Sequence, residues 1–245
     1  MKKKFFDFDV DVKSGDISKS NVDAIVIPEY YKYSERQGLA KIIGSEIGDF
    51  KAFDDYDEIA KNNKLAPADI VITNSYGKNF SKLIHVVTVG VPCSKDEEVA
   101  MVSGAVYNSI VEGYKRGIKS FSFPALNTVM GGRLNFSESA YAMIKGIEDA
   151  ILNIDLKDNE TPKINIIIYN NKIALDVFNK KLQDRIKDIQ PSFLKYKNPK
   201  EMLRRIKRFG DDFSSSNIMG ENFSKMLKIK QQKSFLDDIV VSYDR

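Results

Sequence analysis

Residues 120–133 read SFSFPALNTVMGGR, and this stretch decides the fold. Residues 120–123 form a short apolar run that is typical of a buried strand. Residues 124–133 contain a proline and a Gly-Gly pair, which are typical of a loop. A helical pattern begins near Ser137, which we expect to be the N-cap. A loop that leaves a buried strand and enters a helix predicts one unit of an α/β fold.

The rest of the first three-quarters of the chain repeats this alternation. Short β-rich runs predict strands at residues 5–12, 24–27, 70–73, 83–89 and 164–169. Helical periodicity predicts helices at residues 38–47, 57–62, 97–116, 137–152 and 172–186. Repeated strand-then-helix order predicts a mixed, largely parallel central sheet sandwiched between helices. Residues 5–12 alternate apolar and acidic side chains, which indicates a half-exposed edge strand.

The composition changes near Gln190, and the residues beyond it are basic. Residues 193–233 contain eleven Lys and Arg against four Asp and Glu, so they carry +7 and the remainder carries −3 of the net +4. We therefore expect one domain at residues 1–190 and a basic, mostly helical extension at residues 191–245. Its cations are expected to face solvent or to bind an acidic partner or nucleic acid.

Composition also excludes several kinds of site. The chain has one cysteine, Cys93, and one histidine, His85, which is too few for a disulfide framework or a Cys/His zinc site. His85 lies inside an apolar run, so we expect a structural strand histidine. No run approaches the length of a membrane span, and Asp7 interrupts the segment after the N-terminal lysines. We expect a cytoplasmic protein with no cofactor, no metal and no membrane contact.

Open parallel sheets bind ligands beyond the carboxyl ends of their strands, and two loops of unusual composition leave such ends. One begins at Pro28, and the other is the 124–133 loop. Adjacent glycines allow backbone N–H groups to approach an anion, and Arg133 would add charge-assisted contacts to a phosphate. Taken alone, a Gly-Gly pair before a helix is also typical of a tight turn.

Five segments, taken in order, resemble the macrodomain family, whose members bind ADP-ribose and its derivatives. They are Gly15-Asp16-Ile17-Ser18, Val22-Asp23-Ala24-Ile25-Val26, the pair ADIVIT (68–73) and LIHVV (83–87), FPALNT (123–128) with Gly131-Gly132, and IIIYN (166–170). The resemblance covers roughly residues 5–187. It implies the family's mixed α/β fold and a site for an ADP-ribose-containing ligand.

The resemblance also implies roles for individual residues. Asp16 would accept a hydrogen bond from the adenine amino group, which discriminates against hypoxanthine, and Ile17 would add a backbone contact. Tyr169 would stack near the adenosine end. The full set of ligand-binding residues that we expect is Asp16, Ile17, Pro28, Ala125, Asn127, Thr128, Val129, Met130, Gly131, Gly132, Arg133, Tyr169 and Asn170.

The sequence departs from the family pattern in its first substrate loop. The family's N-A-A-N and glycine run is absent, and Pro28 has a fixed φ and no N–H. Val129 and Ala68 stand where the family has glycines. Glu29 is a candidate catalytic base, although an exposed loop glutamate would also fit.

Three hypotheses about function follow from these matches and departures. The first is a module that binds ADP-ribose, a related nucleotide or a modified protein without turning it over. The second is a hydrolase that removes ADP-ribose through altered residues such as Glu29. The third is a degenerate macrodomain that serves as a protein-interaction platform. The intact Asp16 argues against the third hypothesis, and the lost glycines argue against the second.

Overall fold

The computed structural model describes residues 3–5, 8–31, 38–77, 79–128, 132–154 and 161–193. The chain divides into two compact units, residues 1–186 and 187–245, and of the second only residues 187–193 are described. The domain boundary expected at residue 190 stays a prediction. The helices expected in the basic extension lie outside the described residues.

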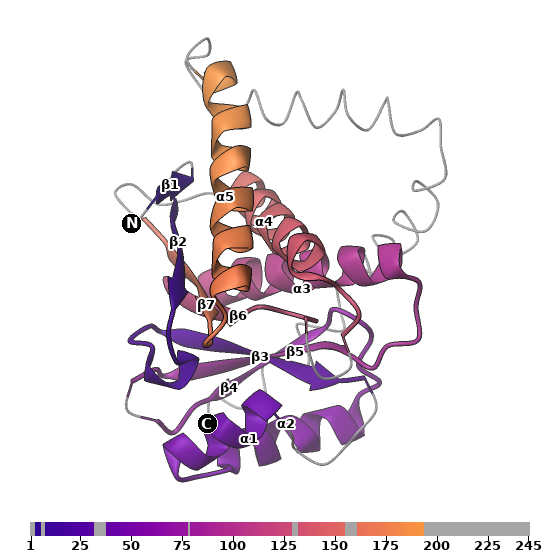
Figure 1. Ribbon diagram of the computed structural model, residues 1–245. Helices are drawn as coiled ribbons and strands as arrows, with labels where there is room; N and C mark the ends of the chain where they lie inside the picture. The colour runs from indigo at the N-terminus through magenta and orange to yellow at the C-terminus, as the bar shows by residue number, and fades with distance from the viewer. Residues whose placement is uncertain are drawn as a thin grey trace. The chain divides into compact units, whose positions relative to one another are not determined.

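The described strands form one seven-stranded sheet in the order β1-β2-β7-β6-β3-β5-β4 (Figure 1). The strands are β1 (Lys3–Phe5), β2 (Phe8–Ser14), β3 (Ala24–Tyr30), β4 (Ile70–Asn74), β5 (Lys82–Val89), β6 (Ser120–Pro124) and β7 (Lys163–Ile168). The interior pairings β2/β7, β7/β6, β6/β3 and β3/β5 are parallel, and β1 and β4 pair antiparallel at the two edges. The mixed, largely parallel sheet expected from the sequence is confirmed.

The N-terminal part of the sheet corrects one expectation. Residues 5–12 were expected to form a single edge strand, but the chain forms the hairpin β1/β2, so that β1 is the edge. The strand β2 pairs with β7 on its other side, and its Asp11 is only 8% exposed. Alternation of apolar and acidic residues correctly indicated a strand, but the expected half-exposed edge is wrong for β2, because the alternation cannot reveal a second strand that is hydrogen-bonded alongside.

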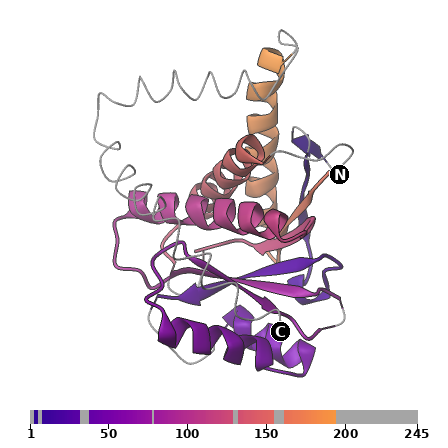
Figure 2. The same cartoon turned by 180° about the vertical axis from the view of Figure 1, so that it is seen from behind.

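Helices cover both faces of the sheet, as Figures 1 and 2 show. On one face lie α1 (Gly38–Ile47) and α2 (Lys51–Asn62). On the other face lie α3 (Lys95–Lys115), α4 (Phe136–Asn153) and the part of α5 (Lys172–Phe193) that belongs to the first unit. A short 3-10 helix, η1 (Ile17–Lys19), follows β2. No helix among the described residues is long and apolar enough to cross a membrane.

The helices α3 and α4 both start with capping boxes. Ser94 caps α3 by accepting a hydrogen bond from the Glu97 N–H, while the Glu97 side chain accepts one from the Ser94 N–H. Asn135 and Glu138 make the same reciprocal pair at the start of α4. The N-cap expected at Ser137 is therefore wrong. Asparagine is as good a cap as serine, and the glutamate three residues later marks Asn135 as the cap.

The helix pairs pack closely enough to set the geometry of the sheet edge. Gly146 of α4 faces α3, where an added Cβ would lie 2.4 Å from the Ser103 backbone oxygen. On the opposite face, Phe53 of α2 is 1% exposed and belongs to a cluster with Ile25 and Ile27 of β3. Burial of each such side chain contributes about 1.5–3 kcal/mol. These contacts hold the helices closely together on one face and α2 against β3 on the other.

Candidate functional site

Several of the described residues expected to bind a ligand lie at or just beyond the carboxyl ends of neighbouring strands. The Gly15 N–H donates to the Ile168 carbonyl over 3.1 Å, which places the end of β2 beside the end of β7. Pro124 of β6 pairs with Ile167 of β7. The carboxyl ends of β2, β7 and β6 are therefore neighbours, and such an edge is where open parallel sheets hold ligands.

Asp16 is held in a fixed orientation at the start of η1. Its Oδ1 accepts hydrogen bonds from the Ser18 N–H at 2.9 Å and the Ser18 hydroxyl at 2.8 Å. Among the described residues, all hydrogen bonds to this carboxylate go to Oδ1. The second oxygen keeps its acceptor capacity, because an ionised carboxylate accepts through both oxygens. Asp16 can cap η1 and accept from a ligand at the same time.

Tyr169 follows the last residue of β7, Ile168, whose carbonyl accepts from the Gly15 N–H, and it is 70% exposed. The next residue, Asn170, has a left-handed backbone with φ +45°, and Asn171 caps α5 by accepting from the Ala174 N–H at 2.9 Å. An exposed aromatic ring at this strand end could stack on a flat heterocycle. Stacking by Tyr169 stays a prediction.

The loop from Asn127 to Arg133 is closed at its base, and we call it the 127–133 loop. Asn127 has φ +56° and is 4% exposed, and its Nδ2 donates to the Thr88 carbonyl and to Glu98 Oε1, both at 2.8 Å. Asparagine is among the few residues that tolerate this backbone conformation, so it can occupy a position suited to glycine. Val129, Met130 and Gly131 lie outside the described residues.

Gly132 packs directly on the start of the same loop. A Cβ at Gly132 would lie 2.2 Å from the Asn127 backbone oxygen. The Leu134 N–H donates to that oxygen over 3.2 Å, and the Thr128 hydroxyl donates to the Ala125 carbonyl over 3.1 Å. The loop returns so closely to its own base that only glycine fits at position 132.

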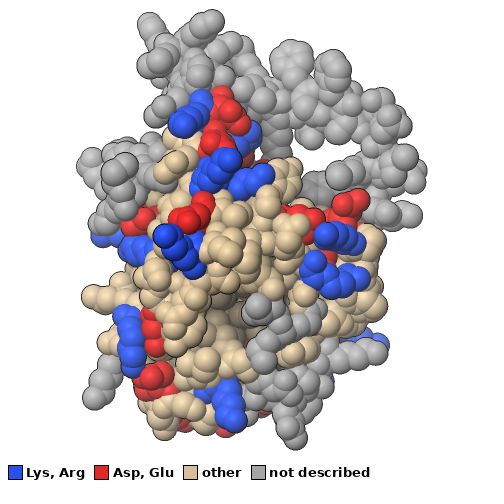
Figure 3. Space-filling view, viewed as in Figure 1, with Lys and Arg blue, Asp and Glu red and all other residues tan. Residues whose placement is uncertain are grey.

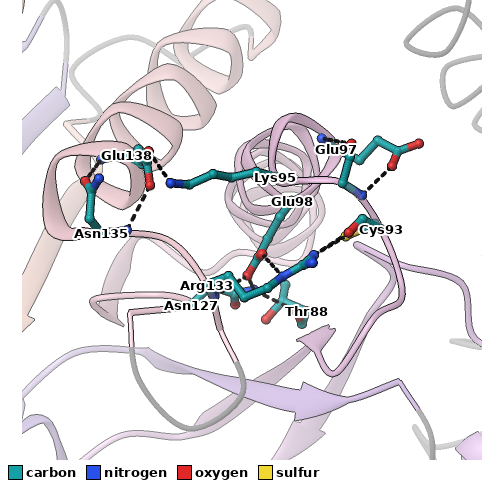
Figure 4. Close-up of polar contacts among 10 residues, drawn as sticks. Thr88, Cys93, Lys95, Glu97, Glu98, Asn127, Arg133, Asn135 and Glu138 are labelled. Atoms are coloured by element: carbon teal, nitrogen blue, oxygen red, sulfur yellow. Dashed lines mark hydrogen bonds and ion pairs between the residues drawn. The ribbon is translucent and has the colours of Figure 1, made fainter.

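A buried glutamate that the sequence analysis missed lies under this loop. Glu98, in the first turn of α3, has a side chain only 3% exposed (Figure 4). Its Oε2 accepts from Arg133 Nε at 3.0 Å, and its Oε1 accepts from the Arg133 backbone N–H at 3.0 Å. Glu98 precedes the buried Val102 by four residues, so helical spacing could have placed it on the buried face.

Arg133, which we expected to contact a phosphate, is paired within the protein. Besides its ion pair with Glu98, Arg133 Nη2 donates to the Cys93 carbonyl and lies 3.4 Å from the Cys93 sulfur. Burial raises the pKa of the Cys93 thiol, although the Arg133 charge opposes the shift. A raised pKa disfavours the nucleophilic thiolate. Arg133 thus joins the loop that precedes α3 to the 127–133 loop.

Glu29 is a strand residue with a buried histidine as its partner. It lies in β3 with its side chain 13% exposed, so the interpretation as an exposed loop glutamate is wrong. Its Oε1 is 2.7 Å from His85 Nδ1, and His85 Nε2 is 3.0 Å from Thr73 Oγ1. The chain turns into a loop only after Tyr30, because β3 continues three residues beyond the apolar run.

His85 is fully buried and both of its ring nitrogens have partners, which confirms the structural role expected for it. Its ring stacks on Tyr56 with centroids 4.6 Å apart and meets the edge of Phe53 at 5.5 Å. Burial, with the Glu29 charge adding to it, raises the pKa of the Tyr56 phenol. His85 therefore links β5 to α2, and its Nδ1 orients the Glu29 carboxylate.

Two further expected residues are part of the scaffold as well as of the edge. Ile17 is 6% exposed and packs in the core cluster under η1, and Pro28 is half-buried within β3.

On the face shown in Figure 3, Lys and Arg are interspersed with Asp and Glu around a neutral middle region. The groups of His, Cys, Asp and Glu within the described ranges include none that could hold a metal ion.

The fold and one segment of the sequence match known proteins. The Macro domain family model matches residues 32–142, whereas no curated protein matches the chain. The structure is similar to the Oceanobacillus iheyensis macrodomain solved with ADP, with a TM-score of 0.65 and 19% identity over 77% of this chain and 97% of that one. A variant of that macrodomain solved with ADPR gives a TM-score of 0.62 and 18% identity over 76% and 98%. The macrodomain of Mycobacterium tuberculosis DarG gives 0.51 and 15% over 66% and 98%.

Proposed function

Because the chain contains a macrodomain, we propose that it binds ADP-ribose, or a nucleotide or modified protein that contains ADP-ribose, at the carboxyl edge of its sheet. The observation that carries the proposal is the placement of two features along that edge. The oriented Asp16 carboxylate and the exposed Tyr169 follow the hydrogen-bonded ends of β2 and β7, and the 127–133 loop follows β6, the other neighbour of β7. The first suits adenine, and the second suits a diphosphate.

The titles of two similar structures support this choice of ligand, since one was solved with ADP and the other with ADPR. The start of α4, immediately after the loop, adds to the support. Helix N-termini favour anions because backbone N–H groups and the helix dipole point toward them. The site needs no metal or cofactor for such binding, because hydrogen bonds and stacking suffice to recognise a nucleotide.

Isothermal titration calorimetry with ADP-ribose, ADP and inosine diphosphate tests the proposal. We expect saturable binding of the first two ligands and binding of inosine diphosphate that is weaker by about 5- to 150-fold, the cost of an unsatisfied buried hydrogen bond. The hypoxanthine ring carries an oxygen where adenine carries an amino group, so it would face the Asp16 carboxylate with no donor. No heat with any of the three would favour the interaction-platform hypothesis instead.

One observation favours a second candidate function, the hydrolysis of an ADP-ribose conjugate. Glu29 stands at the carboxyl end of β3, and the buried His85 orients its carboxylate. A carboxylate oriented in this way suits a general base, which contributes about 10²- to 10⁴-fold to a rate. In this alternative Glu29 would activate a water molecule for attack on the anomeric carbon of the distal ribose.

The two functions are separated by measuring the release of ADP-ribose from an ADP-ribosylated peptide. If the protein is a hydrolase, Glu29→Gln is expected to slow the release about 100-fold or more while ADP binding persists. If the wild-type protein binds the peptide but releases no ADP-ribose, the protein is a binding module. A release rate that Glu29→Gln leaves unchanged would remove Glu29 from the reaction.

A further inference from the structure

Both ends of the 127–133 loop converge on one buried carboxylate. Glu98 Oε1 accepts from Asn127 Nδ2 at 2.8 Å and from the Arg133 backbone N–H at 3.0 Å. Glu98 Oε2 accepts from Arg133 Nε at 3.0 Å. Figure 4 shows that the carboxylate comes from α3, an element outside the loop, so it is an external clamp on the base of the loop.

We propose that Glu98 is a positioning residue that holds the two ends of the 127–133 loop, Asn127 and Arg133, in place for ligand binding, and that Arg133 is the cation that holds Glu98 and not a ligand for phosphate. The inference rests on the proposed function for the identity of the ligand. The contacts that carry it lie entirely within the protein.

Burial explains why this carboxylate needs the contacts that it makes. A buried charge is costly unless it is paired and its remaining lone pairs accept hydrogen bonds. With its side chain 3% exposed, Glu98 has a guanidinium and two further N–H donors, and it also lies in the first turn of α3, where the helix dipole favours an anion. Those same donors belong to the two ends of the loop. The hydrogen bonds that stabilise the buried Glu98 carboxylate therefore also hold the two ends of the loop together.

The charges also argue for this assignment of Arg133. A bare carboxylate under the loop would repel a diphosphate, and Arg133 compensates that charge from a side chain that is 54% exposed. Its Nε and Nη2 are directed at Glu98 and the Cys93 carbonyl. Glu98 would then act on a bound diphosphate only through the positions of Asn127 and Arg133.

Amide hydrogen exchange tests the clamp without any ligand. In the wild-type protein the Arg133 amide, bound to Glu98, and the Leu134 amide, bound to the Asn127 carbonyl, are expected to be protected. Glu98→Gln, which weakens the contact to Arg133, is expected to speed exchange at both amides about tenfold. The Ser139 amide, bound to the Asn135 carbonyl in α4, serves as an internal reference and should not change. Equal exchange in the two proteins would overturn the proposal.

The affinities for ADP and for adenosine, which lacks the diphosphate, test the role in binding. Glu98→Gln is expected to lower the affinity for ADP about tenfold and to leave the affinity for adenosine within about twofold, because only the loop is disturbed. If Arg133 were a phosphate ligand, Glu98→Gln would free it, and the affinity for ADP would hold or rise. That outcome, or an equal loss for both ligands, would overturn the proposal.

A matched ion pair far from the edge provides the control. Glu148 of α4 accepts from Arg185 Nε at 3.0 Å and from Arg185 Nη2 at 2.6 Å, about 18 Å along α4 from its first residue. Glu148→Gln is expected to change neither affinity nor exchange in the loop.

Should Glu98→Gln fail to fold, Arg133→Lys keeps the charge but loses Nε. The faster amide exchange and the lower affinity for ADP are then expected again, but smaller. If wild-type protein binds neither ligand, the proposed function fails while the exchange measurement still decides on the clamp.

Discussion

Asp16→Asn is expected to invert the base preference of the site, so that inosine diphosphate binds more tightly than ADP. The Ser18 N–H can only donate and so requires an oxygen at the position of Oδ1, which puts the new amide nitrogen at the position of Oδ2. A donor would then face the adenine amino group but could pair with the hypoxanthine oxygen. We expect ADP affinity to fall about 5- to 150-fold, which corresponds to 1–3 kcal/mol. Calorimetric titration of both nucleotides measures the change.

The asparagine variant is preferable to alanine because it retains the cap of η1. Loss of such a cap costs about 0.5–2 kcal/mol of stability, which would confound the affinity measurement. Ser18→Ala is the matched control, because it removes one hydrogen bond from Oδ1 and leaves the outward oxygen in place. Should Ser18→Ala weaken ADP binding as much as Asp16→Asn does, the role of Asp16 would be structural. Equal losses for both nucleotides with Asp16→Asn would exclude base recognition by this side chain.

Gly132→Ala is expected to lower ADP affinity by more than about tenfold and the free energy of unfolding by about 1–3 kcal/mol, the usual cost of forcing extra volume into a packed site. The added methyl group would lie 2.2 Å from the Asn127 oxygen and 2.3 Å from its carbonyl carbon. Both atoms belong to the backbone, so the collision cannot be relieved by rotating a side chain. Either the loop opens or the hydrogen bond from Leu134 to Asn127 breaks. Urea unfolding and ADP titration measure the two effects.

Gly15→Ala is the matched control on the same edge of the sheet. An added Cβ at Gly15 would meet no atom within 4 Å. The substitution is therefore expected to leave stability within about 0.5 kcal/mol, as is usual for surface changes. If Gly132→Ala bound ADP as the wild-type protein does, the loop would tolerate an open base, and its closed shape would be irrelevant to binding.

Much of the fold followed from local patterns. The helix at residues 38–47 was predicted at the bounds that α1 has, because its apolar spacing and flanking glycine are local signals. The start of α2 was predicted six residues late, although Phe53 and Tyr56 carry the helical spacing that extends it to Lys51. The hairpin β1/β2 was missed because residues 6 and 7 are Phe-Asp and lack the glycine, proline or asparagine that marks a turn in a sequence.

The candidate site was predictable to the extent that its residues follow strands in a known order. Asp16, Asn127 and Tyr169 each lie just beyond a strand end, and parallel pairing brings those ends together. Asn127 has φ +56°, a backbone conformation that favours glycine and that asparagine tolerates, and this could not be read from the sequence. Ala68, which stands where the family has a glycine, also keeps the left-handed backbone conformation, with φ +68°.

By itself, the sequence determined the strand–helix order, the macrodomain resemblance and the segments that meet at the carboxyl edge, because each of these depends on residues close together in the chain. Only the tertiary structure decided which partners the charged side chains take. Glu98 meets Arg133 across 35 residues and Glu29 meets His85 across 56. Such pairs form because burial forces a charged or polar group to find a donor or acceptor, and the folded chain alone determines which one lies within reach.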